Sequence, residues 1–459
     1  MSLTGEVVEF LLRGDSPPQE VRAKAVEHIV DGVAVMLAGS RTDCAGKLVG
    51  FVGERGGRLS STVIGFGLRS SPSDAALVNG TSGHADDYDD TQLSTAPDRI
   101  YGLMTHPTVP VLAAALAVGE AMGCSGSELL DAYIAGFEVE CKLAEAIRPE
   151  HYRRGFHSTA TMGTFGACAA VGRLMGLGEG ELRYALGIAA SLSSGIRANF
   201  GTMTKPLHAG MAASNGVVAC MLGGRGFTSD LNALDGRWGF MEILGGGADP
   251  ELMVGRMGNP YALVHPGATF KMYPCGSLGQ PSMDALLEIV LKEDLGPEDV
   301  REIRLRAGPN ILDPLRYPAP VDDLQAKFSL QFGLASILLR RKAGLREYSM
   351  EWVMDPILRE AMGRVRTIHD EEVASMDVDR MRSVVEVELV DGRVIRRVAD
   401  TARGTPEKPL KPHELDGKFR ECASFALDEG RAEEVLGLVR GLEGVSRVGD
   451  LMGLLAGGG

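Results

Sequence analysis

The chain has 459 residues, 44% of them hydrophobic and 24% charged, which is typical of a globular protein with a sizeable core and two or three domains. Its 61 acidic and 47 basic residues give a formal net charge of −14, which argues against nucleic acid or an anionic membrane as a partner. The seven cysteines are widely spaced and form no CxxC pair, so we expect a cytoplasmic protein without a zinc ribbon or disulfide framework.

The first half of the chain predicts helices. From Pro18 to about Gly224 apolar residues recur at helical spacing, beginning with Val26, Ile29 and Val33. Further helices are expected over residues 108–122, 126–147, 158–175, 180–194 and 209–222. Ala, Gly, Ser and Met dominate their faces, which favours a compact, layered bundle of closely spaced helices. The longest apolar run, residues 109–119, is too short to cross a bilayer.

The pattern changes near residue 265. The following segment predicts helices at 282–291 and 328–340, a strand at 300–306, and a hairpin of strands 384–390 and 393–398 around Asp391-Gly392. Helices return at 418–427, 431–442 and 448–455. We therefore predict a mainly α protein. A large all-helical domain, residues 1–267 and 403–459, is discontinuous and completed by the C-terminal tail, and residues 268–402 form a smaller α+β lid domain.

Basic side chains stand directly before three of the predicted helices. The junctions are His106-Pro107-Thr108, His157-Ser158-Thr159 and Lys205-Pro206-Leu207-His208. Thr108, Ser158 and Thr159 are candidate N-caps. A helix N-terminus attracts anions and lowers the pKa of a nearby histidine, so that a neutral imidazole can act as a base near pH 7. One histidine before a helix is usually a capping or surface residue, but three such junctions favour an anion-binding, acid–base site.

An acidic segment runs from His84 to Thr91, with four aspartates within five residues. A charge run of this kind is usually a solvated helix end. Its functional interpretations are a magnesium site like that of all-helical isoprenoid synthases, or a carboxylate network that orients histidines and binds a substrate hydroxyl. Magnesium-diphosphate chemistry calls for a second acidic cluster on a facing helix, and none precedes residue 290. The network is therefore favoured, with Asp87 and Thr91 facing the substrate and Asp86, Asp89 and Asp90 holding the turn.

These motifs resemble the MmgE/PrpD family, which contains 2-methylcitrate dehydratase, cis-aconitate decarboxylase and iminodisuccinate epimerase. The matching stretches run along nearly the whole chain: residues 79–91, 106–110, 155–164, 200–210 and 271–276. The resemblance implies a helical domain with an α+β lid, a homodimer, a pocket between the two domains, and no metal or organic cofactor. It also implies that the active-site residues of the decarboxylase branch correspond here to Asp87, Thr91, His106, His157 and Lys205, and that Tyr317 is the lid tyrosine.

One departure from the family concerns the lid. Many relatives carry a histidine shortly after the Tyr-Pro-Cys-type stretch, whereas residues 276–281 contain none here. Gln280 can form hydrogen bonds in this region but cannot transfer protons near pH 7. The stretch from Phe200 to Pro206 also looks more like the epimerase branch.

We therefore predict a cofactor-independent acid–base enzyme for a small di- or tricarboxylic acid, most simply a lyase of the 2-methylcitrate dehydratase or cis-aconitate decarboxylase type. Lys205 and His208 are expected to bind carboxylates, His106 or His157 to remove a proton, Asp87 to orient that base and Thr91 to hold a substrate oxygen. Further expected substrate contacts are His84, Gln280 and Tyr317. The alternatives are an epimerase of the iminodisuccinate type and, more distantly, a magnesium-dependent isoprenoid-type enzyme or a non-catalytic carboxylate sensor.

Overall fold

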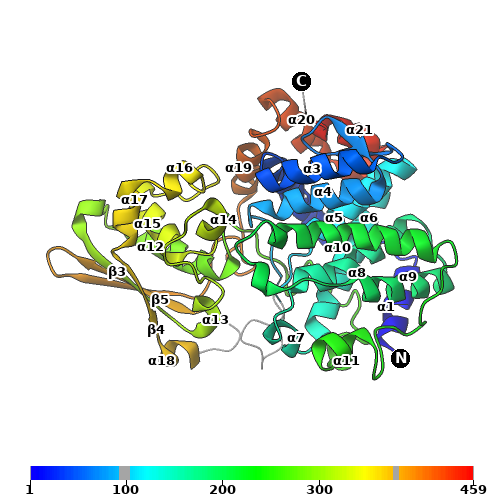
Figure 1. Cartoon of the computed structure of the whole chain (residues 1–459), viewed down its shortest axis with the longest axis horizontal. Helices are drawn as coiled ribbons and strands as arrows, with labels where there is room; N and C mark the ends of the chain where they lie inside the picture. Colours follow the sequence, from blue (N-terminus) through cyan, green and yellow to red (C-terminus); the bar gives the residue numbers. More distant parts are fainter. Residues whose placement is uncertain (1, 93–103, 376–381, 458–459) are drawn as a thin grey trace.

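The chain forms a large helical body beside a smaller body built on a twisted sheet (Figure 1). The computed structural model describes residues 2–92, 104–375 and 382–457. The predicted fold class, mainly α with a smaller α+β part, is confirmed. Within the described residues, no helix combines the length and the apolar character needed to cross a membrane.

The helical body contains long helices from the first half of the chain together with three from its end. Its elements are α1 (Leu3–Leu12), α2 (Gln19–Gly39), α3 (Asp43–Arg55), α4 (Pro72–Ala85), α5 (Thr108–Met122), α6 (Gly126–Ala146), α7 (Glu150–Arg153), α8 (Ser158–Leu174), α9 (Glu179–Leu192), α10 (Thr204–Gly223), α11 (Phe240–Gly245), α19 (Pro412–Ala423), α20 (Glu429–Arg440) and α21 (Val448–Leu455). A short hairpin of β1 (Ser61–Val63) and β2 (Leu68–Ser70) was not predicted.

Small residues allow the central helices to approach closely, as their composition predicts. Helix α10 packs against α4 and α8. A Cβ atom added at Gly210 of α10 would lie 2.2 Å from the Leu77 carbonyl oxygen of α4, and one at Gly216 would lie 2.5 Å from the Ala167 Cβ of α8. This close layer is important for the site because Asp87 follows the end of α4, His157 directly precedes α8 and Lys205 lies in α10, and all three side chains line the same cavity.

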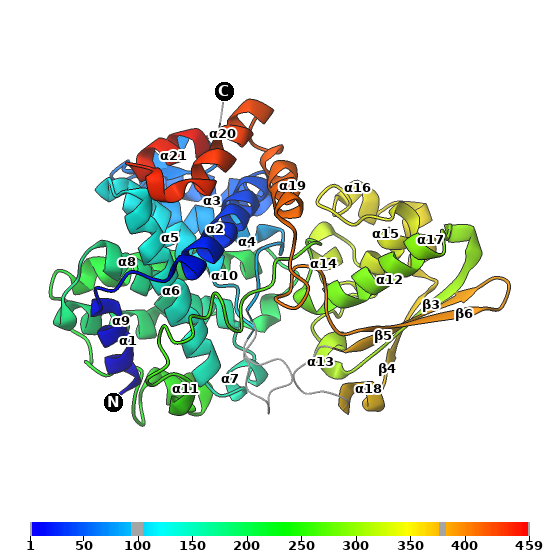
Figure 2. The same ribbon diagram turned by 180° about the vertical axis from the view of Figure 1, so that it is seen from behind.

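The smaller body is a four-stranded sheet with helices on one face (Figures 1 and 2). The strand order is β4-β3-β5-β6, in which β3 and β4 are parallel and the other pairs are antiparallel. Its elements are α12 (Gln280–Lys292), β3 (Val300–Ala307), α13 (Pro309–Leu312), α14 (Asp323–Ala326), α15 (Leu330–Arg340), α16 (Met350–Val353), α17 (Pro356–Met362), β4 (Val365–His369), α18 (Glu371–Ser375), β5 (Ser383–Leu389) and β6 (Val394–Ala399). The predicted hairpin is present, and Gly392 in its turn has a φ of 89°, which favours glycine.

The two bodies have separate hydrophobic cores. One fills the helical body and includes residues of α19, α20 and α21, so the C-terminal tail does pack back onto the first half of the chain. The other lies between the sheet and its helices and also takes in Phe200 from the helical body. These cores support the predicted division into residues 1–267 with 403–459, and 268–402, which we keep as a proposal. The second part is called the lid below.

Two helix starts differ from the predictions by five residues or more. Helix α10 begins at Thr204 rather than 209, and α19 begins at Pro412 rather than 418. Both differences have one physical reason, because proline is favoured in the first turn of a helix, where a missing N–H costs nothing. The sequence Lys205-Pro206 therefore lies inside the first turn of α10 rather than in a loop before it.

Candidate active site

The acidic segment from Asp86 to Asp90 is buried, so its interpretation as a solvated helix end is wrong. It follows the last residue of α4, and Asp87 takes up a left-handed conformation with a φ of 51°. Each aspartate has its own basic partner: Asp86 pairs with Arg41 and Lys327, Asp87 with Lys205 and Lys271, Asp89 with His84, and Asp90 with His28. The segment is thus a buried junction where charges from the helical body and the lid meet.

Asp87 lies between two lysines. Its Oδ1 atom accepts hydrogen bonds from Lys205 Nζ at 3.0 Å and Lys271 Nζ at 2.8 Å, and its backbone carbonyl accepts a second one from Lys271. Burial alone would raise the pKa of this carboxyl, but the charges of the two lysines outweigh it and hold the pKa well below its usual range. Its Oδ2 atom is buried, has no hydrogen-bond partner among the described residues and can accept a hydrogen bond from a ligand.

Lys205 is the cation of the site. Its Nζ atom lies 2.8 Å from His84 Nε2, in addition to its bond to Asp87, and within 5.5 Å of the ring centres of Phe200 and Phe328. Burial lowers the pKa of Lys205, and the charge of Asp87 opposes that shift. An ammonium group has three N–H donors, so two protein partners leave one donor for a substrate oxygen.

Four histidine rings surround the lysine. The His84 ring lies 4.7 Å from that of His106 and 5.7 Å from that of His157, and His157 Nδ1 lies 3.0 Å from His208 Nδ1. Burial lowers the pKa of His106 to about 3 and of His208 to about 4, and it also lowers those of His84 and His157. All four are therefore neutral at pH 7. Burial, and not the helix ends emphasised by the sequence, is the largest cause.

The hydrogen bonds of His106 fix its tautomer. Its Nδ1 atom lies 2.8 Å from the Asp90 carbonyl oxygen, which can only accept, so this nitrogen carries the proton. The Nε2 atom of the neutral ring then holds a lone pair. His106 can thus serve as a base.

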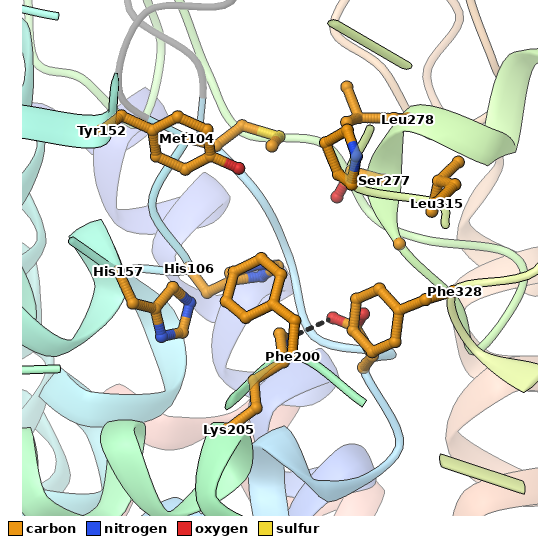
Figure 3. A pocket seen from close by; sticks show the side chains of 13 residues that line it. Met104, His106, Tyr152, His157, Phe200, Lys205, Ser277, Leu278, Leu315 and Phe328 are labelled. Carbon is orange, nitrogen blue, oxygen red and sulfur yellow. Dashed lines mark hydrogen bonds and ion pairs between the residues drawn. The ribbon is translucent and has the colours of Figure 1, made fainter. Parts of the chain in front are cut away.

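A cavity between the helical body and the lid brings these groups together (Figure 3). The helical body contributes its polar wall, with Asp87, Met104, His106, Tyr152, His157, Phe200 and Lys205. The lid contributes Gly276, Ser277, Leu278, Pro314, Leu315 and Phe328. Among the described residues that line the cavity, every titratable side chain comes from the helical body.

The predicted site residues fall into two groups. Asp87, His106, His157 and Lys205 line the cavity, whereas Thr91, His84, His208, Tyr317 and Gln280 do not. Each of the second group supports a neighbour. The Thr91 hydroxyl lies 2.7 Å from Ser277 Oγ, and the Tyr317 hydroxyl donates to the Phe200 carbonyl at 3.0 Å. His84 and His208 lie behind Lys205 and His157.

Two expected roles need correction. Asp87 orients the lysines rather than a histidine base. Gln280 accepts hydrogen bonds from the Met272 and Tyr273 backbone and donates to the Tyr273 carbonyl, so its amide holds the chain before α12 instead of facing a substrate. The candidate N-caps also differ. The N-caps of α5 and α8 are Pro107 and His157, and neither makes a side-chain capping bond. Thr108 instead donates its hydroxyl to Asp90.

Several site residues were not predicted as such. Lys271 was part of a matching motif but was given no role, although it is the sole lysine between Lys205 and Lys292 and stands between Phe270 and Met272. An isolated lysine among apolar residues is a signal that a buried carboxylate needs a partner. No comparable sequence signal marks Ser277, Phe200 or Phe328, because serine and phenylalanine are common in any core or loop.

The cluster also raises the question of a metal ion. His84, Asp87, Asp89 and His106 offer ligand atoms within 4.8 Å of one another, a spacing that could hold one. However, Lys205 already occupies His84 Nε2 and shares Asp87 Oδ1 with Lys271. A divalent cation there would face two ammonium groups across the atoms it needs, so we assign no metal to these residues.

Comparison with known proteins places this site in a family. The MmgE/PrpD N-terminal domain matches residues 10–253, and the MmgE/PrpD C-terminal domain matches residues 273–443. The chain is similar to several curated proteins named cis-aconitate decarboxylase. That from Homo sapiens is 30% identical over 411 residues, which cover 87% of this chain and 82% of the relative. That from Mus musculus is 29% identical over 441 residues, covering 94% and 88%, and that from Aspergillus terreus is 25% identical over 481 residues, covering 99% and 96%.

Proposed function

Because this chain belongs to the MmgE/PrpD family, we propose that it is a lyase acting on a small di- or tricarboxylic acid, with cis-aconitate as the leading candidate substrate. The observation that carries the proposal is the cavity between the helical body and the lid. It presents a cation, Lys205, beside two neutral imidazoles, those of His106 and His157, on one wall. A carboxylate substrate, a base and an acid can meet there.

We assign three roles on this wall. The ammonium of Lys205 binds a substrate carboxylate and stabilises the negative charge that develops when a C–C or C–H bond breaks. The Nε2 lone pair of His106 accepts a proton, or His157 does so from its neighbouring position. Asp87 holds Lys205 in place and is itself held by Lys271.

Both lyase reactions are compatible with these groups. Loss of CO2 breaks a C–C bond, shifts the electron pair along the unsaturated acid and adds one proton to carbon, for which the Lys205 ammonium is a donor. Loss of water removes a C–H proton with a base and protonates the leaving hydroxyl with an acid. The proposal needs neither a metal nor an organic cofactor, because the charge stabilisation comes from lysine.

Epimerisation of a dicarboxylate is the second candidate, favoured by the absence of a titratable side chain among the described lid residues that line the cavity. A lid without a proton donor departs from many dehydratase and decarboxylase relatives. However, an epimerase that removes and returns a proton on opposite faces needs groups on opposite walls, and the described groups share one wall. We therefore rank it second.

The proposal is tested by incubating EDTA-treated protein with cis-aconitate, 2-methylcitrate and related di- and tricarboxylates, and following substrate and product by chromatography. We expect turnover of at least one acid without added metal. Activity that vanishes on chelation and returns with Mg²⁺ would contradict the metal-free assignment, and binding without turnover of any acid would favour a sensor. The homodimer implied by the family resemblance stays a prediction, which light scattering checks.

A further inference from the structure

Asp89 and Asp90, two adjacent residues of the acidic segment, each bind a buried histidine. The two histidines differ in what their rings contact on the other side. His28 Nδ1 lies 2.7 Å from Asp90 Oδ2, and the His28 ring stacks on Phe270 inside the core of the helical body. His84 Nδ1 lies 2.8 Å from Asp89 Oδ2, and its other nitrogen contacts Lys205 Nζ at 2.8 Å. Among the described residues, it is therefore the side chains of the second pair that continue to a residue lining the cavity.

Hydrogen-bond chemistry restricts which atoms of Asp89, His84 and Lys205 can carry protons. A lysine ammonium can only donate, so it requires a bare His84 Nε2, a proton on Nδ1 and an ionised Asp89 to accept it. A protonated Asp89 donates instead to Nδ1, which moves the ring proton to Nε2 and leaves Lys205 as a neutral amine to accept it. Each arrangement contains the same number of protons.

We propose that Asp89 and Lys205 share one proton through His84, which makes Asp89 and His84 positioning residues that set the protonation state of Lys205. This inference rests on the proposed function. In the transfer, an Nζ–H bond of Lys205 breaks as Nε2–H forms, and Nδ1–H breaks as O–H forms on Asp89. The lysine can thus change between ammonium and amine in a closed cavity without exchanging a proton with solvent.

The surroundings of the three residues bring the two proton arrangements closer together in free energy. The titratable groups around His84 are Asp87, Asp89, His106, His157, Lys205, His208 and Lys271. Burial lowers the pKa of Lys205 and raises that of Asp89, so both shifts favour the neutral pair over the ion pair. Lys271 stays on Asp87 in either state, so that carboxylate keeps a cationic partner when Lys205 is an amine.

The decisive variant is Asp89→Asn, which keeps the shape of the side chain but cannot take the proton. We expect kcat to fall at least about 100-fold with KM changed less than about threefold, because binding contacts remain. The charge of the ionised Asp89 raises the pKa of Lys205 and so favours its ammonium form; we therefore expect the loss of that charge to move the basic limb of the kcat/KM pH profile toward lower pH. If Asp89 had a structural role alone, its replacement would lower activity without moving the basic limb of the pH profile.

His28→Asn is the matched control, because it breaks the neighbouring buried pair that faces the core. It is expected to cost stability but to leave the pH profile in place. A profile of Asp89→Asn that superimposes on that of the wild type, or an equal displacement in His28→Asn, would overturn the proposal.

A second readout needs no activity and no folded Asp89 variant. Nitrogen-15 NMR of the histidine-labelled wild-type protein reports the tautomer of His84, assigned against Lys205→Met and His84→Gln. We expect a neutral ring from pH 5 to 9 with a single proton on Nδ1 or shared between both nitrogens. A doubly protonated ring at pH 7 would overturn the shared proton. If the wild type turns over no acid, the proposed function fails while this spectrum still decides the inference.

Discussion

The two walls of the cavity differ in the chemistry of their side chains although they line the same space. The helical wall carries Asp87, His106, His157 and Lys205, each held by buried partners, whereas the lid wall offers Ser277 and apolar side chains. If the cavity is the active site, reactive groups and enclosure come from separate parts of the chain. In the proposed function, the helical body supplies the groups that move protons and bind carboxylates, and the lid supplies the surface that excludes water and shapes the substrate.

The division follows from how each wall is supported. Side chains on the helical wall project from the closely packed helices α8 and α10 and from loops held at helix ends. A rigid frame of this kind is what precise acid–base chemistry needs. The lid contacts the helical body partly through buried ion pairs, among them Lys271 with Asp87 and Lys327 with Asp86. Each of the following predictions tests one side of this comparison.

The largest effect is expected on the helical wall. Lys205→Met removes the cation that binds and stabilises the substrate, and kcat/KM should fall by roughly 1,000-fold, or about 4 kcal/mol. Steady-state kinetics on cis-aconitate or the acid that proves active measures it. Lys408→Met, which changes an exposed lysine paired with Glu288, is the control and should retain activity. A kcat/KM of Lys205→Met within threefold of the wild type would remove this residue from the site.

The contact between the walls should show mainly in stability. Lys327→Met leaves the buried Asp86 with Arg41 alone and removes a donor to the Ala85 carbonyl, so the free energy of unfolding should fall by about 3 kcal/mol. Urea unfolding of this variant is compared with Lys342→Met, which breaks an exposed pair with Glu421 and should cost less than about 1 kcal/mol. Equal losses of unfolding free energy in the two variants would show that the buried contact stabilises the protein no more than an exposed ion pair does.

A change on the lid wall should alter rate without altering pH dependence. The Phe328 ring stacks on Phe200 with ring centres 5.7 Å apart and lies beside Lys205. Phe328→Leu should therefore lower kcat/KM about tenfold through looser closure and loss of the cation–π contact. The pH profile should superimpose on the wild type because the residue does not titrate. A displaced profile would show that the lid takes part in proton chemistry.

The smallest effect concerns the buried histidines behind the helical wall. His208 titrates near its usual pKa in the unfolded chain but only at about 4 in the folded one, so the unfolded state takes up the proton first as pH falls below 6.5. Its contribution to stability is thus present at pH 7 and is lost toward pH 4. His208→Gln should reduce the drop in Tm between pH 7 and pH 5 by about 2 °C or more. An unchanged drop would argue against a neutral, buried His208.

Local sequence patterns predicted most of the fold but few of the side-chain contacts between its parts. Helix α5 was predicted with its observed ends, because apolar periodicity and Gly123 after its last residue are local signals. The hairpin around Asp391-Gly392 was equally clear. The early starts of α10 and α19 were missed because a proline was read as a boundary rather than as a first-turn residue.

The site shows the same limit. Asp87, His106, His157 and Lys205 carried recognisable motifs and do meet at the cavity. Lys271 lies 184 positions from Asp87, and no local pattern reports that such a contact forms. Gln280 was misjudged for the opposite reason, since its partners are its own near neighbours and a sequence does not show that they use up its amide. The exclusion of water from the acidic segment likewise depends on tertiary packing.

The central claim is that the helical wall performs lyase chemistry on a small polycarboxylate. The most direct test is proton NMR of cis-aconitate and a panel of related acids with EDTA-treated protein in D2O. We expect loss of CO2, with one deuterium added to carbon in the product, or loss of water, and neither reaction with Lys205→Met. Exchange of a substrate proton for deuterium with every carbon and oxygen retained would contradict the lyase assignment and establish an epimerase instead.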